Sequence, residues 1–146
     1  MVVAPVSSAI IIMPAVAIGA VIGLYEAIIL HRDVSVPTHR FGHTIHAFIY
    51  AIIAVFITMN TMWVYNTFAF LHSVPGIQYP IVFQGIVGII TMIKIHGASK
   101  VIQSKYGMAS VGLAETWTHS FIISGLVVAA PYIWPFLAPM MPSWLK

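Results

Sequence analysis

The stretch HTIHAFIYAIIAVFITMNTMWVY, residues 43–65, decides the fold class of this chain. It contains no Asp, Glu, Lys or Arg, and a helix needs about 20 consecutive, mostly apolar residues to cross the hydrocarbon core of a bilayer. The run is too long and too continuously apolar for the alternating strands of about ten residues that form membrane barrels. We therefore expect a transmembrane helix over 44–65.

Three further apolar segments resemble this one, and we expect them to form helices over 6–30, 81–102 and 113–137. The composition agrees, because 60% of the residues are hydrophobic and only 6% are charged, against about 25% charged in a typical soluble domain. The expected fold is an all-α integral membrane protein, with four transmembrane helices in a small bundle. Four spans and short loops fill the chain, so 1–146 is expected to be a single transmembrane domain.

The residue types that are missing exclude several kinds of chemistry. The chain has no cysteine, which rules out disulfides, thiolate metal sites and cysteine nucleophiles. No phosphate-binding G-x-x-x-x-G-K-[ST] motif occurs. The only aspartate, Asp33, follows Arg32 directly, where a counter-ion role fits better than membership of a hydrolase triad. The start of the chain has no basic residue ahead of its long apolar run, so we expect a retained helix rather than a signal peptide.

The distribution of basic residues gives an orientation. Five of the six lie in the first and third expected loops or close to them, namely Arg32, Arg40, Lys94, Lys100 and Lys105. Short loops rich in Lys and Arg face the cytoplasm, so both termini are expected on the outer side. The net charge of +3 then reflects topology, and no nucleic-acid partner is expected. The expected location is the cell membrane of a prokaryote, as a multi-pass protein.

Small residues form a packing face on the first helix. Ala15, Gly19, Gly23 and Ala27 recur every four residues, which places them on one helix face where a neighbouring backbone can approach closely. The sequence leaves open whether that neighbour belongs to this chain or to another. In the outer halves of the helices, Asn60 and Gln84 can form hydrogen bonds across helices.

Histidines and glutamates gather at the expected cytoplasmic face. His39, His43 and His46 are spaced i, i+4 and i+7, so they share a face if the helix already includes them. Glu115 and His119 are spaced i, i+4 at the start of the last helix. Every helix offers at least one candidate metal ligand: His39, His43, His46, His96, His119, Glu115 and Glu26. His72 lies on the opposite side.

This cluster has three interpretations that the sequence leaves open. Imidazole and carboxylate ligands on facing helices suit zinc, iron, manganese or copper. Two histidines on different helices, such as one from the second helix and His119, could instead hold haem b. In the third interpretation, the histidines hydrogen-bond to water, headgroups and helix ends at the interface, and the glutamates pair with Lys94 or Arg40. That interpretation needs no cofactor.

Together these features favour a small non-catalytic integral-membrane subunit of a larger multi-subunit complex, contributing helix packing and assembly. Its expected partners are the lipid bilayer and other integral-membrane subunits or further copies of itself. One alternative is a metal- or haem-binding membrane redox protein that uses the His/Glu cluster. A second alternative is a small oligomeric transporter. The sequence does not decide whether the chain is an enzyme, although activity on its own is disfavoured.

Overall fold

The computed structural model of the chain describes residues 9–33, 37–106 and 117–146. Side chains are described for 9–28, 45–96 and 117–146. These residues form helices and loops and contain no strand, so the all-α fold class is confirmed for them. The long helices are α1 (Met13–Asp33), α2 (Pro37–Met59), α4 (Pro80–Tyr106) and α5 (Trp117–Leu137). The shorter elements are α3 (Thr61–Thr67), η1 (Ala69–Ser73), η2 (Ala138–Met140) and η3 (Ser143–Leu145).

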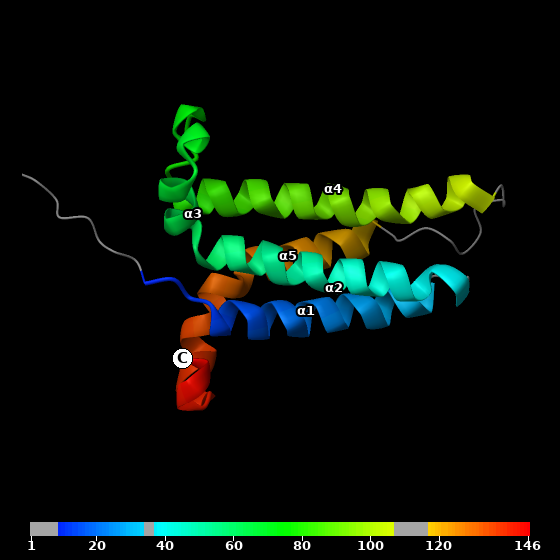
Figure 1. Cartoon of the computed structure of the whole chain (residues 1–146), viewed down its shortest axis with the longest axis horizontal. Coiled ribbons are helices and arrows are strands. Elements are labelled where there is room, and N and C mark those ends of the chain that lie inside the picture. The colour runs from blue at the N-terminus through cyan, green and yellow to red at the C-terminus, as the bar shows by residue number, and fades with distance from the viewer. Residues whose placement is uncertain (1–8, 34–36, 107–116) are drawn as a thin grey trace, which may run out of the picture.

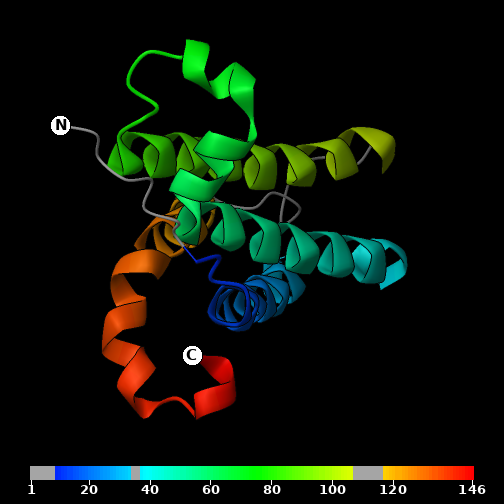
Figure 2. The same cartoon turned by 60° about the vertical axis from the view of Figure 1, so that its left-hand side comes forward.

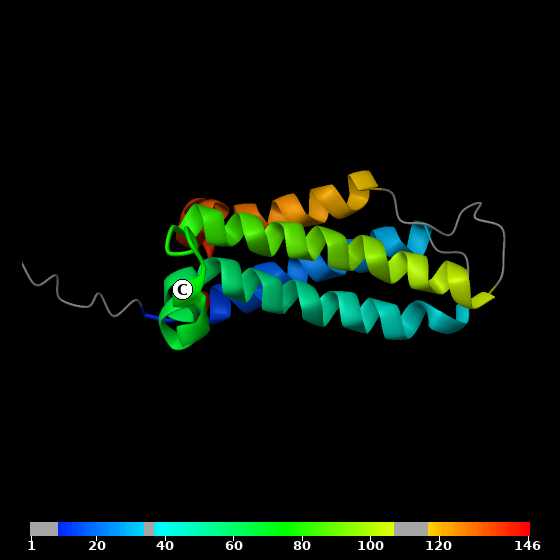
Figure 3. The ribbon, with the colours of Figure 1, turned by 90° about the horizontal axis from the view of Figure 1, so that it is seen from above.

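The four long helices lie side by side and alternate in direction (Figures 1 and 3). α1 packs along α2, α4 packs along α5, and contacts of α2 with α4 and α5 join the two pairs. The beginning of α1, the helix α3 and the C-terminus lie at the same end of the bundle (Figure 1). We call this the α3 end. The basic residues that were expected in or near the first and third loops lie in α1, α2 and α4, in the halves toward the opposite end.

The first helix begins later than expected. Residues 9–12 are not helical, and α1 starts at Met13 with Pro14 in its first turn, where the missing N–H of proline costs little. The side chain of Asn60 binds the preceding segment. The N–H of Ile11 donates to Oδ1 of Asn60 at 2.7 Å, and Nδ2 of Asn60 donates to the carbonyl of Ile11 at 3.0 Å. This clamp holds residue 11 outside the helix.

The second expected helix is interrupted. Instead of running unbroken over 44–65, α2 begins at Pro37, and the chain bends by 87° between Met59 and Thr61. Asn60 occupies the break, with φ −121° and ψ 34°, and its Nδ2 also donates to the carbonyl of Phe56 at 2.9 Å. An asparagine whose amide bonds to nearby backbone competes with helix continuation, which explains the bend.

The last two long helices follow the expected runs more closely. α4 begins with Pro80 as its first residue and extends past the expected end to Tyr106. α5 is described from Trp117, so the expected start over 113–116 lies outside the described residues. The helix continues through Pro131 and Pro135, and its last part curves away from α4 (Figure 2).

Helix length and composition support membrane association only in part. Among the described residues, Trp117–Met140 is long and apolar enough to cross a membrane, and the bent pair Ile45–Met59 and Thr61–Thr67 meets the same criterion when taken together. Met13–Ile28 and Pro80–His96 are apolar but shorter. By length and composition, the described residues therefore contain one helix that could cross a membrane, or two if the bent pair counts as one span. The expected bundle of four spans is not established.

Candidate functional site

A hydrogen-bonded network joins three helices of the bundle near the α3 end. Oη of Tyr132 donates to Oε1 of Gln84 at 2.6 Å, and Nε2 of Gln84 donates to the carbonyl of Thr58 at 3.1 Å. Oγ1 of Thr58 lies 3.0 Å from the carbonyl of Val127 and can donate to it. These bonds connect α2, α4 and α5. Hydrogen bonds between helices contribute to their association.

The packing of α4 against α5 depends on one glycine and one serine. Oγ of Ser124 donates to the carbonyl of Gly88 at 2.6 Å. A Cβ added to Gly88 would lie 2.5 Å from Cγ2 of Val128, which is closer than carbon atoms approach in proteins. The absence of a side chain at Gly88 therefore allows the two helices to come within hydrogen-bonding distance.

The small-residue face of α1 packs against α2 of the same chain. A Cβ added to Gly19 would lie 2.6 Å from the Cα of Ile52, and one added to Gly23 would lie 2.9 Å from the Cα of Phe48. Ala15 and Ala27 are buried as well. The open question of the partner helix thus has an answer: it is α2. This face is not available to another subunit in this structure.

Three of the candidate ligands are buried on three different helices. Glu26 on α1, His96 on α4 and His119 on α5 are 3%, 7% and 4% exposed. All three lie in the halves of their helices away from the α3 end. The ring of His96 stacks on that of Trp117 with 3.7 Å between centroids. Burial of ionisable residues within an apolar bundle is uncommon and usually marks a functional or structural requirement.

The other candidate ligands are not part of a described cluster. His46 is exposed on α2 and its ring is 6.5 Å from that of Tyr50, which lies beneath the ammonium of Lys94. The side chains of His39 and His43, and the whole of Glu115, lie outside the described part of the chain. Where side chains are described, no group of three His, Cys, Asp or Glu residues could hold a metal ion.

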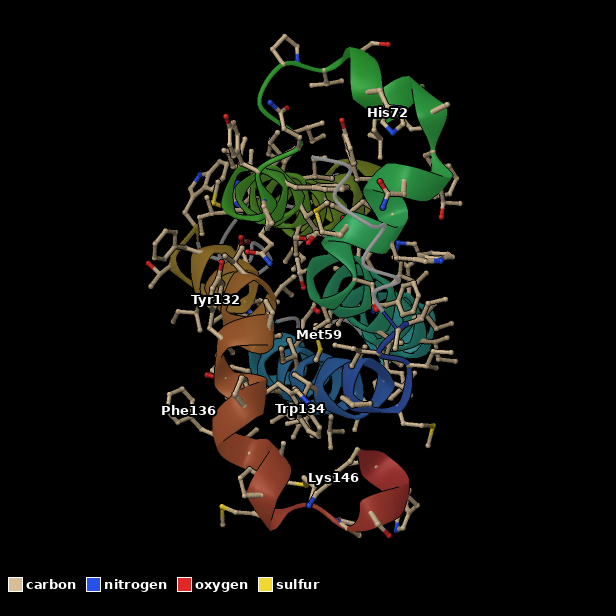
Figure 4. The ribbon with its side chains drawn as sticks, turned by 90° about the vertical axis from the view of Figure 1, so that its left-hand side faces the viewer. Met59, His72, Tyr132, Trp134, Phe136 and Lys146 are labelled. Carbon is tan, nitrogen blue, oxygen red and sulfur yellow. The ribbon has the colours of Figure 1, made fainter. Side chains whose placement is uncertain are left out.

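His72 lies at the α3 end, apart from the other histidines, as expected (Figure 4). Its Nε2 is 3.0 Å from the carbonyl of Tyr65, so the imidazole joins η1 to α3. Sequence reasoning identified Asn60 and Gln84 as polar groups able to bond across the bundle, but it missed Thr58 and Tyr132. A tyrosine hydroxyl near the end of an apolar run and a threonine inside one are too common to indicate a network by themselves.

Among the described residues, apolar grooves lie between α4 and α5 and between α1 and α5. The first, which we call the α4–α5 groove, has a volume of about 360 Å³ and includes Gly85 and Gly125 in its wall. A Cβ added to either glycine would meet no atom within 4 Å. The second, the α1–α5 groove, has a volume of about 410 Å³ and lies between α1, α5 and the C-terminal residues.

Comparisons of the chain with protein-family models, with curated proteins and with solved structures found no match.

Proposed function

We propose that this chain is a small non-catalytic integral-membrane subunit whose helices α1, α2, α4 and α5 cross the bilayer, and that it assembles with other membrane subunits or with copies of itself. The supporting observation is that many polar side chains are buried while many large apolar side chains are exposed, which is the reverse of the usual distribution in a water-soluble protein. Among the described residues, ten polar or charged residues are buried beside sixteen apolar ones, while thirty large apolar side chains are exposed. Exposed apolar surface on this scale indicates contact with lipid or protein rather than water.

All four long helices share this distribution. Val21, Ile53, Ile93 and Phe121 are each about half exposed or more, one on each helix. Burying such a side chain away from water contributes about 1.5–3 kcal/mol, so a bundle of this kind would be poorly stable as a monomer in water. Within hydrocarbon the same side chains are in a favourable environment.

Helix α5 gives the strongest indication of a span. In its most apolar window only 22% of the residues are buried, whereas the core helix of a soluble protein is mostly buried. α4 and α2 pack beside α5, and α1 packs along α2, so a bilayer around α5 would surround all four. At about 1.5 Å per residue, the 16 residues of the apolar part of α1, Met13–Ile28, extend about 24 Å, somewhat less than the roughly 30 Å of a hydrocarbon core.

The orientation in this proposal follows the basic residues. Arg32, Arg40, Lys100 and Lys105 belong to the end of the bundle opposite α3. The positive-inside rule places that end in the cytoplasm and the α3 end on the outer side, consistent with the cell membrane of a prokaryote.

Assembly is proposed to use the surface of α4 and α5 rather than the small-residue face of α1. The α1 face is filled by α2, while Gly85 and Gly125 leave open space in the α4–α5 groove. Small residues on a lipid-facing helix surface allow another helix to approach closely. A subunit that contributes packing surfaces needs no catalytic group of its own.

The test is gentle extraction from the native membrane, followed by identification of co-purifying proteins for the wild type and two variants. Gly125→Leu should leave the chain folded and reduce the recovery of partners several-fold, because the new side chain fills the α4–α5 groove. Ala17→Leu, which adds a similar bulk in the other groove, is the control and should retain the partners. A wild-type protein that purifies as a monomer without partners would refute the subunit role.

A second candidate function is a metal- or haem-binding membrane redox protein. Its support is the burial of His96 and His119 on α4 and α5, which pack together, although the described side chains contain no group of three that could hold a metal ion. An absorption spectrum and elemental analysis of the extracted protein test it. A haem band, or near-stoichiometric metal that is lost in His96→Ala and His119→Ala but kept in His72→Ala, would support this function. A colourless and metal-free preparation would refute it.

A further inference from the structure

Two segments leave the bundle at its α3 end and run across the direction of the long helices. One contains α3 and η1, residues 61–73, and the other contains the end of α5 with η2 and η3, residues 136–145. We call them the α3 arm and the C-terminal arm. They extend in opposite directions (Figure 1), and the end-on view shows His72 and Lys146 on opposite sides of the long helices (Figure 4). The chain turns by 87° between α2 and α3.

Contacts with the bundle hold both arms in these directions. In the α3 arm, Val64 and Leu71 are buried and belong to the same apolar core as the long helices. Nε2 of His72 lies 3.0 Å from the carbonyl of Tyr65 and joins η1 to α3. In the C-terminal arm, η3 contacts α1. Turning either arm into line with the long helices would break these contacts.

The arms expose aromatic side chains together with small polar ones. No Asp, Glu, Lys or Arg occurs in either arm. The exposed aromatic side chains are those of Phe68, Phe70, Phe136 and Trp144, and the exposed polar ones include those of Asn66, Ser73 and Ser143. This mixture suits the boundary between acyl chains and headgroups, where one side of a segment meets hydrocarbon and the other meets hydrated groups.

The direction of the arms favours lipid as the partner of this surface. In a bilayer that surrounds the four long helices, a segment that crosses their direction at one end lies parallel to the membrane surface. Between the α3 arm and α4, Tyr79 and Ile81 are also exposed. Exposed apolar side chains therefore follow the chain from the arm onto α4, whose surface is proposed to face lipid.

We propose that the two arms form a crossbar that lies in the outer interface of the bilayer and contacts both the headgroups and the adjoining parts of the acyl chains. The inference rests on the proposed membrane location of the bundle. Phe70 and Trp144 enter the acyl-chain boundary, while Asn66, Ser73 and Ser143 stay hydrated. The crossbar sets the depth of the bundle, because its apolar side chains oppose movement into water and its polar ones oppose movement into hydrocarbon.

The experiment places a nitroxide spin label on single cysteines of the full chain in phosphatidylcholine vesicles. Collisions of the label with oxygen, which concentrates in hydrocarbon, and with a water-soluble nickel complex measure its depth. Phe70→Cys and Trp144→Cys report one arm each, at side chains that are 68% and 67% exposed, so neither label disturbs the core. Val21→Cys, at an equally exposed position near the middle of α1, is the matched control inside the bilayer.

Both arm labels should lie about 5–10 Å into the interface, at depths that agree within about 5 Å, the radius of a helix. The label on Val21→Cys should lie near the bilayer centre, about 15 Å from either edge of the hydrocarbon.

Two results would overturn the crossbar while leaving the proposed span intact, provided that the Val21→Cys label is deep. In the first, the arm labels meet the nickel complex as freely as a label in water. In the second, they are shielded from both oxygen and nickel, which shows that protein, such as a second copy of the chain, covers the arms. A Val21→Cys label that is open to nickel would overturn the proposed function itself.

Discussion

Asn60 is the residue on which the α3 end of the bundle depends most. Its side-chain amide bonds to the N–H and carbonyl of Ile11 and to the carbonyl of Phe56, at 2.7 to 3.0 Å, and the residue is 5% exposed. It therefore joins the first described segment of the chain to the end of α2 and also stabilises the bend into α3. A hydrophobic residue of similar size could do neither.

We expect Asn60→Ala to lower the free energy of unfolding by about 1–3 kcal/mol, since it leaves the backbone groups of Ile11 without their partner. Unfolding of the micelle-bound protein by a denaturing detergent, followed by circular dichroism, measures this. Asn66→Ala changes an exposed asparagine of α3 and should have little effect. Equal stability of the two variants would show that the clamp is not important.

The hydroxyl of Tyr132 gives a second expectation at the residue scale. Tyr132→Phe removes only the bond to Gln84, and hydrogen bonds between membrane helices typically contribute about 0.6 kcal/mol and at most about 1.7. We expect Tyr132→Phe to lower the free energy of unfolding by an amount in this range, measured with the same unfolding assay. Tyr79→Phe, at an exposed position, is the control. If Tyr132→Phe lowers the free energy of unfolding no more than Tyr79→Phe does, the bond between Tyr132 and Gln84 does not stabilise the bundle.

At the scale of elements, the glycines of the bundle differ in what surrounds them. At Gly19 an added Cβ would contact the backbone of α2, which no side-chain rotation can relieve. At Gly125 there is open space. Similar glycines within apolar helices are therefore expected to respond in opposite ways to the same substitution.

Gly19→Ala should destabilise the chain by about 1–3 kcal/mol, because α1 must move away from α2. Gly125→Ala should be neutral or stabilising by up to about 1 kcal/mol, since alanine favours the helix. Thermal unfolding of both variants in one detergent tests the pair. Destabilisation by Gly125→Ala as large as that by Gly19→Ala would contradict the packing described here.

The sequence predicted the long helices because continuous apolar runs determine where they form. It did not predict the late start of α1, because this depends on a contact between Ile11 and Asn60, which are 49 residues apart. It did not predict the bend either, because an asparagine in an apolar run does not by itself show whether its amide will bond to nearby backbone. The spacing of Ala15, Gly19, Gly23 and Ala27 indicated a contact face, but only the fold shows that α2 occupies it. Candidate ligands on one helix face could be identified from spacing, whereas their distances across helices could not.

At the scale of the whole molecule, the bundle is proposed to span a membrane with its α3 end outside. The chain has no cysteine, so single introduced cysteines report accessibility without background. Ser73 in η1 and Ser143 in η3 are exposed at the α3 end, and Ser104 lies in the last turns of α4 at the other end. Each replacement exchanges one small polar side chain for another.

The most direct measurement is labelling of Ser73→Cys, Ser143→Cys and Ser104→Cys in intact cells with a membrane-impermeant thiol reagent, compared with labelling after the cells are opened. We expect the first two to react in intact cells and the third to react only after opening. Reaction of all three only after opening, with the protein recovered in the soluble fraction, would contradict the membrane-spanning bundle. Reaction of Ser104→Cys alone in intact cells would contradict the orientation.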